Sequence, residues 1–422
     1  MPARGRKVLI RTRALLGAWV LSCLAGLTPA WADGTLLIVG GALREDNAEV
    51  HRALIEAMLP VGPMVIIPAA SGRPARSAAA FAGSLEAHGV PRERIKVFPL
   101  AVRDDTDTAD VDESQWLENA WRSELIENIN DAAGFWFTGG DQVRITQTLV
   151  NTQQQESPLL ELVRERLAAG AVVGGSSAGA AIMSHDMIAG GTSFTSLLEP
   201  MQRAYTSTDD QDSGRLFIHH GLGFLPDGIV DQHFDRKARL GRLVRALAAT
   251  GQRRGFGIDE NTALEIRLGD DFARVLGQGS VTLLDASTAR FGFDTPQLAS
   301  NLVLSIVAPG VSFRQSDFSI LSGQGSPTVG KEYFGYAPVQ GGGMALANPR
   351  LDQALGFDLL DNDSTRQLQR YSIDSDGRII VYRFTQTPQS QGHWRSEGSV
   401  DRYTISGVRF DILRGVAQIK YH

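Results

Sequence analysis

The chain has 422 residues, enough for one large α/β domain with a smaller module. Hydrophobic residues make up 43% and charged residues 21%, an ordinary balance that excludes a largely disordered, collagen-like or polytopic membrane chain. The single cysteine excludes an intrachain disulfide and a cysteine-based metal site, and the net charge of −6 disfavours nucleic acid as the main partner, because phosphate binding needs a basic surface.

The N-terminal segment has the pattern of a secretory signal peptide. Residues 1–13 carry five basic side chains and no acidic one, residues 14–32 carry no charge, and the segment ends in Ala-Trp-Ala before Asp33. We therefore expect residues 1–32 to be removed, which leaves a secreted or periplasmic protein without membrane attachment. A lipid anchor at Cys23 is the alternative. Removal takes the net charge from −6 to −11, which favours cationic ligands.

From residue 35 onward, apolar runs alternate with amphipathic segments. The runs, which predict buried strands, are 35–39, 64–68, 95–100, 135–137 and 171–173, and similar runs follow at 228–230, 255–258, 262–267 and 280–284. The segments between the first runs predict helices at 48–59, 76–88, 118–128 and 159–169. This alternation indicates a parallel sheet with helices on both faces, where ligands bind at the carboxyl ends of the strands.

The sequence changes character after about residue 295. Helical periodicity becomes weaker, glycine, serine and glutamine become more frequent, and a turn at Asp374–Gly377 precedes a strand-like run. The short runs of this region are 378–382, 399–405, 408–413 and 416–419. We therefore predict an α/β domain over residues 33–295 and a β-rich C-terminal module over 296–422, whose role the sequence leaves open.

A serine lies in the sequence context of a nucleophile elbow. Gly175-Ser176-Ser177-Ala178-Gly179 fits the pattern G-x-S-x-G, follows the apolar run at 171–173 and precedes a small-residue helix start. The flanking glycines allow the tight turn that presents the hydroxyl above the sheet, and the register selects Ser177 as the nucleophile. The alternative is a glycine-rich turn without a nucleophile.

A serine nucleophile needs a base and an orienting acid. His233 follows the run at 228–230 directly, so it can reach the serine from the end of a neighbouring strand, whereas His219 and His220 lie in a stretch that is either strand or loop. Asp259 and Glu260 end the next run. Because neighbouring strand residues face opposite ways, only one of these two acids can join the site.

Four motifs, taken together in their order, resemble the cyanophycinase family, serine peptidases of the dipeptidase E-like clan. The motifs are Phe137–Gln142, Gly174–Ala180, Asp231–Phe234 with Arg236, Arg239 and Arg242, and Gly257–Ala263. The resemblance covers about residues 35–290, and the export signal and the long tail are similar to the extracellular bacterial branch. It implies a flavodoxin-like, doubly wound parallel sheet related to class I glutamine amidotransferases, so that residues 33–295 would be a peptidase domain.

The resemblance also implies roles for individual residues, without a metal or cofactor. Ser177 would be the nucleophile, His233 the base and Glu260 the orienting acid. The N–H groups of Gly140 and Ala178 would form the oxyanion hole. Substrate-binding residues would be Gln142, Asp231, Arg239 and Arg242. Without the resemblance, the two arginines are typical of a solvated helix face.

The implied substrate is cyanophycin, a poly-aspartate chain with arginine joined to each β-carboxyl group, and the implied product is the β-Asp-Arg dipeptide. The enzyme would be an exopeptidase and a homodimer. Asp209, Asp210 and Asp212 are candidates for binding the substrate guanidinium, with a solvated loop as the alternative. Two other functions remain open: an aspartyl dipeptidase of the same clan, and a non-catalytic protein that binds the polymer.

Overall fold

The computed structural model describes residue 1 and residues 34–204, 214–322, 325–341 and 350–418. The predicted signal peptide and Cys23 therefore lie outside the described residues, apart from Met1. The described residues from 34 onward belong to one unit of the chain. No helix within the described ranges combines the length and the apolar character that crossing a membrane requires.

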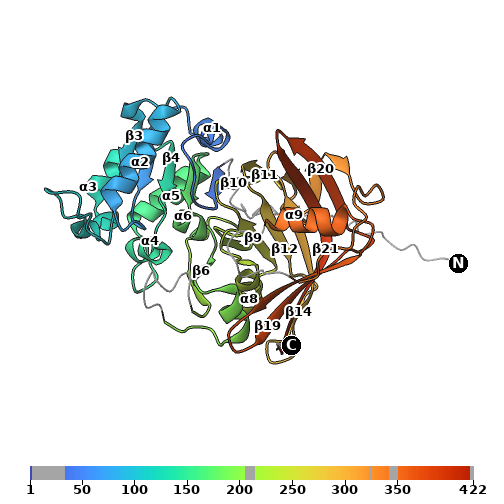
Figure 1. Cartoon of the computed structure of the whole chain (residues 1–422). Coiled ribbons are helices and arrows are strands. Elements are labelled where there is room, and N and C mark those ends of the chain that lie inside the picture. Colours follow the sequence, from blue (N-terminus) through green and yellow to red (C-terminus); the bar gives the residue numbers. More distant parts are fainter. Residues whose placement is uncertain (2–33, 205–213, 323–324, 342–349, 419–422) are drawn as a thin grey trace. The chain divides into compact units, whose positions relative to one another are not determined.

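Five parallel strands form one side of the first sheet, as the sequence predicts (Figure 1). In spatial order they are β1 (Thr35–Val39), β5 (Val172–Ser176), β4 (Gly134–Phe137), β2 (Met64–Ile67) and β3 (Ile95–Val97). Four antiparallel strands continue the sheet beyond β1: β10 (Thr262–Arg267), β11 (Ala273–Gly277), β15 (Ser312–Phe313) and β16 (Ile320–Ser322). The predicted doubly wound α/β fold is thus confirmed, with an antiparallel extension.

Helices cover both faces of this sheet. Alternate residues of β1 point to opposite faces, so Leu37 and Val39 pack in a different core cluster from Leu36 and Ile38. The first cluster includes residues of α1 (Ala48–Glu56) and α2 (Pro74–Ala87). The second includes residues of α4 (Gln142–Leu149), α5 (Pro158–Ala168) and α6 (Ala178–Ala181). The helix predicted at 118–128 is wrong as a continuous element: Arg122 has an extended backbone between short turns and α3 (Ser123–Ile126).

Three of the strands that the sequence predicts for the parallel sheet belong instead to a second sheet. It contains β8 (Ile229–Asp231), β9 (Arg254–Ile258) and β12 (Val281–Asp285). Strands β8 and β9 are parallel, and β12 is antiparallel to β9. The expectation of one continuous parallel sheet is therefore wrong. The reason is the turn at 259–261, where the chain leaves β9 in the second sheet and enters β10 in the first.

The C-terminal residues extend this second sheet, and the predicted β-rich region is present. Its longest strand, β21 (Val400–Val416), joins the predicted runs 399–405 and 408–413 and ends at the first residue of the run 416–419. Its other strands are β13 (Arg290–Phe291), β14 (Gln297–Val307), β17 (Ser326–Pro327), β18 (Gln367–Ile373), β19 (Arg378–Thr385) and β20 (Gln391–Glu397). Because β12 pairs with β14, one sheet runs across the predicted boundary at residue 295. The division into two domains stays a prediction.

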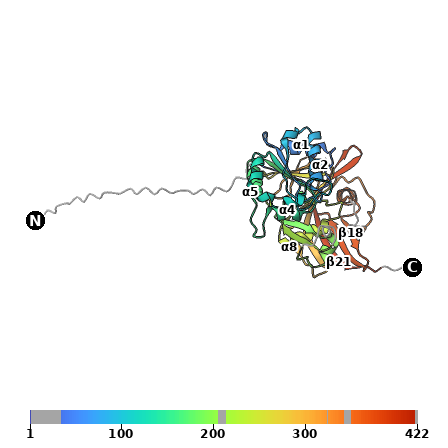
Figure 2. The same cartoon turned by 90° about the vertical axis from the view of Figure 1, so that its left-hand side faces the viewer.

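The remaining elements connect or cover these two sheets (Figure 2). They include α7 (Ser193–Leu198), α8 (Leu240–Thr250) and α9 (Leu351–Leu355), which a π-helical turn at Gly356–Leu360 follows. They also include a separate antiparallel pair of strands, β6 (Asp186–Gly190) and β7 (Phe217–His220). A third core cluster contains Leu243 of α8, Leu284 of β12 and Phe410 of β21. Residues on both sides of position 295 thus share one hydrophobic core.

Candidate active site

Ser177 lies in the sharp turn between β5 and α6. Its backbone has φ 57° and ψ −108°, a strained conformation for a residue with a side chain, and its N–H donates to the Val39 carbonyl at 3.0 Å. A Cβ on Gly175 would lie 2.5 Å from the Gly179 carbonyl oxygen, and one on Gly179 would lie 2.9 Å from the Phe137 carbonyl carbon. The two glycines of the motif are therefore required by close backbone approach, as a nucleophile elbow demands.

His233 reaches Ser177 from the second sheet. It lies two positions beyond the end of β8, and its backbone has φ 47°. Its N–H donates to the carbonyl of Gly40, the residue after β1, at 2.6 Å. The Ser177 hydroxyl lies 2.8 Å from His233 Nε2. A Cβ on Gly41 would lie 2.8 Å from His233 Nδ1 and nearer still to Cε1. The imidazole thus packs directly on Gly41, which the sequence alone identifies only as a tight turn.

Glu260, in the turn that links the two sheets, completes a chain of hydrogen bonds. His233 Nδ1 donates to Glu260 Oε1 at 2.7 Å. The neighbouring Asp259 is buried and accepts instead from the backbone N–H groups of Asp235 at 3.2 Å and Ser280 at 2.9 Å. Of the two acids that the sequence left open, Glu260 is the one that contacts the imidazole.

Burial controls the protonation of this site. Partial burial lowers the pKa of His233 below its usual 6.5, and the hydrogen bond to Glu260 opposes that shift. The positive charges of Arg239 and Lys237 lower the pKa of His233 further. The imidazole is therefore neutral at pH 7, with Nδ1 protonated toward Glu260 and Nε2 free to accept the serine proton.

The predicted oxyanion-hole residues border the nucleophile. Gly140 has φ +141°, and a Cβ there would lie 2.6 Å from the Ala70 carbonyl carbon. A Cβ on the adjacent Gly139 would lie 3.3 Å from Ser177 Cβ, so this turn passes beside the serine. Within the described part of the chain, the N–H groups of Gly140 and Ala178 donate no hydrogen bond. Both are available to a ligand, and their catalytic role stays a prediction.

Asp231, Arg239 and Arg242 form a buried charged cluster. The Arg242 guanidinium donates to both carboxylate oxygens of Asp231, at 2.8 and 2.6 Å, and to the Gly191 carbonyl at 2.8 Å. Arg239 Nη1 lies 3.8 Å from the same carboxylate and donates to the Gln232 carbonyl at 2.6 Å. With Arg239 and Arg242 only 4% and 2% exposed, the alternative of a solvated helix face is wrong. Their contact with substrate stays a prediction.

The Gln142 side chain also makes a hydrogen bond within the protein. Gln142 begins α4, is 2% exposed, and donates its side-chain amide to the Ile188 carbonyl of β6 at 2.9 Å. This bond ties the turn after Gly140 to the neighbouring β6–β7 pair. Asp209, Asp210 and Asp212, the predicted partners of the substrate guanidinium, lie outside the described residues.

Residues beyond position 295 approach the acid end of the site. A pocket of about 330 Å³ is lined by Glu260, Asp235 and Arg350, the last from the segment that begins α9. Burial, with the nearby charge of Asp352, raises the pKa of Asp235 to about 6. Burial also raises the pKa of Asp259 well above its usual range. No motif in the sequence indicates that Arg350 or Asp352 lies near these carboxyl groups.

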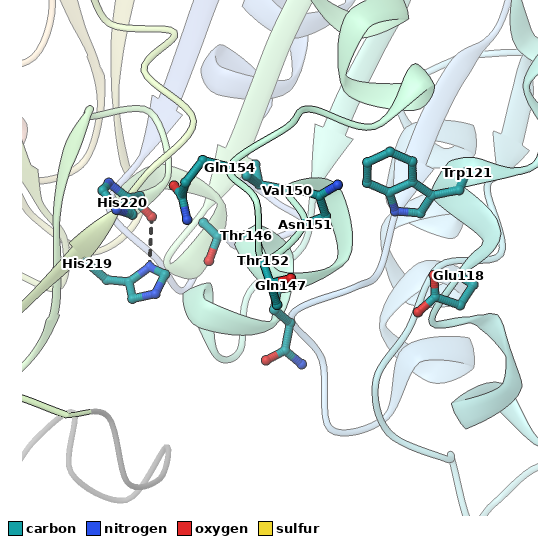
Figure 3. A pocket seen from close by; sticks show the side chains of 10 residues that line it. All are labelled: Glu118, Trp121, Thr146, Gln147, Val150, Asn151, Thr152, Gln154, His219 and His220. Carbon is teal, nitrogen blue, oxygen red and sulfur yellow. Dashed lines mark hydrogen bonds between the residues drawn. The ribbon is translucent and has the colours of Figure 1, made fainter.

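His219 and His220, at the end of β7, line a different pocket. It measures about 540 Å³, and its other walls include Glu118, Trp121 and Gln154 (Figure 3). His219 Nδ1 donates to the His220 carbonyl at 3.1 Å, and Ser177, His233 and Glu260 do not line this pocket. These two histidines are therefore no alternative to His233 as the partner of Ser177.

Comparisons with known proteins agree with this geometry. Residues 36–274, more than half of the chain, match peptidase family S51. The chain is 30% identical over 305 residues to a cyanophycinase of Trichormus variabilis, covering 70% of this chain and 90% of that protein. It is 31% identical over 300 residues to a cyanophycinase of Geminocystis herdmanii, covering 68% of this chain and 96% of that protein.

Among solved structures, a peptidase from an acI-B1 Actinobacterium is 22% identical, with a TM-score of 0.44, covering 67% of this chain and 97% of that chain. The family match and the two relatives span the strands and turns that carry Ser177, His233 and Glu260. The chain belongs to peptidase family S51 and is a serine peptidase.

Proposed function

We propose that this chain is an exported serine-type exopeptidase that hydrolyses cyanophycin to β-Asp-Arg dipeptides through an acyl-enzyme. The observation that carries the proposal is the unbroken chain of hydrogen bonds from Ser177 through His233 to Glu260, with lengths of 2.8 and 2.7 Å. The similarity to cyanophycinases, among them the two that are 30% and 31% identical to this chain, supports cyanophycin as the substrate.

The first half of the reaction acylates the serine. Ser177 Oγ attacks the carbonyl carbon of a backbone aspartyl unit while His233 Nε2 takes the hydroxyl proton. Glu260 holds the imidazole in the tautomer that accepts this proton and stabilises the imidazolium that forms. When the tetrahedral intermediate collapses, the C–N bond breaks and His233 returns the proton to the leaving amine.

The second half releases the dipeptide. A water molecule gives a proton to His233 Nε2 and attacks the acyl-serine carbonyl, and the proton then returns to Ser177 Oγ as the ester bond breaks. The N–H groups of Gly140 and Ala178 stabilise the negative oxygen in both halves. Each such donor is worth on the order of 3 kcal/mol of activation free energy in related acyl-transfer sites.

Export and assembly belong to the same proposal. Residues 1–32 carry the signal pattern, and cleavage there leaves a mature chain that begins at Asp33. Mass spectrometry of the protein recovered outside the cytoplasm checks the cleavage site, and light scattering checks the proposed homodimer. A recovered chain that still contained residues 1–32 would contradict the export step.

The direct test is the identity of the products released from authentic insoluble cyanophycin. We expect mass spectrometry to find β-Asp-Arg with the wild-type mature protein and none with Ser177→Ala. Cleavage of Asp-X dipeptides without release from the polymer would instead identify an aspartyl dipeptidase. Polymer binding without turnover would identify a non-catalytic binding protein, and both results would contradict the proposal.

A further inference from the structure

A pocket beside the nucleophile is used by none of the catalytic steps above. It measures about 370 Å³, within the range of about 300–1,000 Å³ that small ligand sites occupy. Gly139 and Ser176 line it, and both border Ser177: Ser176 precedes it in the chain, and a Cβ on Gly139 would lie 3.3 Å from Ser177 Cβ. A group in this pocket would therefore lie next to the reacting carbonyl.

The charge of the pocket selects for a cation. Glu45 supplies the one carboxylate among its lining residues, and neither lysine nor arginine lines it within the described ranges. The other titratable group is His51, which donates Nδ1–H to the Asn47 carbonyl at 2.9 Å and accepts at Nε2 from the Ser84 hydroxyl at 2.7 Å. Burial lowers the pKa of His51, so the imidazole is neutral and the pocket carries a net negative charge.

The Glu45 side chain is exposed, and its carboxylate forms no ion pair within the described part of the chain. The Glu45 main chain, in contrast, is held by a hydrogen bond. His88 Nε2 donates to the Glu45 carbonyl at 2.7 Å, and the His88 ring stacks on His51 with centroids 4.3 Å apart. These contacts fix the loop after β1 while the exposed carboxylate remains available to a ligand.

The uncharged part of the lining suits a flat cation on an apolar stem. Phe81 of α2 lines the pocket and stacks on Trp136 of β4, with ring centroids 4.2 Å apart and planes inclined by 8°. A guanidinium stacks on aromatic rings and donates two parallel hydrogen bonds to a carboxylate, whereas an ammonium group acts as a point charge. The buried Thr138 hydroxyl also lines the pocket and has no hydrogen-bond partner among the described residues.

We propose that Glu45 receives the guanidinium of an arginine side chain in a unit adjacent to the scissile bond. This inference rests on the proposed function, since cyanophycin carries one arginine on each aspartyl unit. Glu45 then acts as a specificity-determining residue: it places the unit beside Ser177 through its side chain and takes no part in proton transfer.

The test uses two synthetic substrates that differ only in charge. One is the trimer of β-Asp-Arg, and the other is the same trimer with citrulline, whose neutral urea group replaces the guanidinium. We would measure kcat/KM for both with the wild-type mature protein, Glu45→Gln, and the control Glu93→Gln, an exposed residue outside the pocket. Thermal unfolding would verify that all three proteins fold alike.

We expect Glu45→Gln to lose about tenfold in kcat/KM on the arginine trimer and less than threefold on the citrulline trimer, because only the charged hydrogen bonds are removed. The control should retain the wild-type ratio between the two substrates. If Glu45→Gln also retains that ratio, Glu45 does not bind the guanidinium. If the wild type hydrolyses neither trimer, the proposed function itself fails and the inference fails with it.

Discussion

At the scale of single residues, the position of the His233 imidazole depends on a residue that has no side chain. Gly41 has φ +112°, and the imidazole occupies the space where a Cβ would lie. The sequence shows Gly40-Gly41 after a strand but cannot show that a histidine almost 200 positions later packs on it. Ser177 is different, because the glycines that shape its turn lie only two positions away on either side in the sequence.

We predict that Gly41→Ala lowers kcat by about 10²-fold, since displacing a catalytic group by about 1 Å has that effect. Gly89→Ala is a matched control: Gly89 also has positive φ, at +92°, but a Cβ there would meet no atom within 4 Å. Both variants should lose about 1–3 kcal/mol of unfolding free energy for the strained backbone, and Gly41→Ala should lose more than Gly89→Ala because its Cβ meets the imidazole. Equal activity of the two variants would show that Gly41 does not position His233.

The pH dependence of kcat/KM should report the protonation of His233. Since burial lowers its pKa, the active neutral imidazole persists at lower pH, and we expect kcat/KM to rise with pH through a midpoint below 6.5. Glu260→Gln removes the hydrogen bond that raises this pKa. The midpoint should therefore move further down, while kcat falls roughly 10³-fold because the tautomer is no longer fixed.

Glu93→Gln, an exposed change of the same kind, should leave the pH profile as in the wild type. An upward shift of the midpoint in Glu260→Gln would be incompatible with the hydrogen bond between Glu260 and His233. The sequence reduced the choice of acid to Asp259 and Glu260, and only the resemblance to a family selected one. The turn between the sheets explains this choice, because the Asp259 carboxylate already accepts hydrogen bonds from two backbone N–H groups.

At the scale of elements, a buried ion pair joins the strand before His233 to the helix after it. Asp231 ends β8, Arg242 lies in α8, and the guanidinium also holds the Gly191 carbonyl after β6. The pair thus fixes three elements around the segment that carries His233. Sequence periodicity places Arg239 and Arg242 on one helix but cannot show that this face is buried, because charged residues usually face solvent.

We predict that Arg242→Ala destabilises the protein by about 3–5 kcal/mol, because the buried Asp231 carboxylate loses both hydrogen bonds from Arg242 and keeps the more distant Arg239 Nη1, at 3.8 Å. Arg254→Ala is the comparison: Arg254 pairs with Asp227, but the two side chains are 29% and 47% exposed. Its removal should cost less than about 1 kcal/mol. Urea denaturation of both variants measures these losses of unfolding free energy. A loss of under about 1 kcal/mol for Arg242→Ala would show that the buried pair with Asp231 is not important for stability.

At the scale of the whole molecule, the sequence identifies the layers of the first sheet but not the boundary of the second. The strands from β1 to β5 can be recognised from short stretches of sequence, because buried parallel strands are continuously apolar. The pairing of β12 with β14, across position 295, cannot be predicted from a short stretch of sequence. For the same reason, no sequence pattern predicts that Arg350 and Asp352 lie beside the carboxyl groups near Glu260.

We predict that a chain ending at residue 295 does not form a stable, active domain. Truncation would remove β14, one of the two strands that pair with β12, and expose apolar residues such as Leu284, which is fully buried in the core cluster shared with Phe410. Size-exclusion chromatography and far-UV circular dichroism would show aggregation or loss of folded structure, with the full mature chain as the control. A monodisperse, active truncated protein would show that the C-terminal module is dispensable.

Covalent labelling measures whether His233 activates the Ser177 hydroxyl. Intact-protein and peptide mass spectrometry after reaction with a serine-directed phosphonate should find one adduct, on Ser177, in the wild-type protein and none in Ser177→Ala. In His233→Ala the adduct should form at least about 100-fold more slowly. An adduct on another residue, or labelling of Ser177 at the wild-type rate without His233, would show that His233 does not activate the Ser177 hydroxyl.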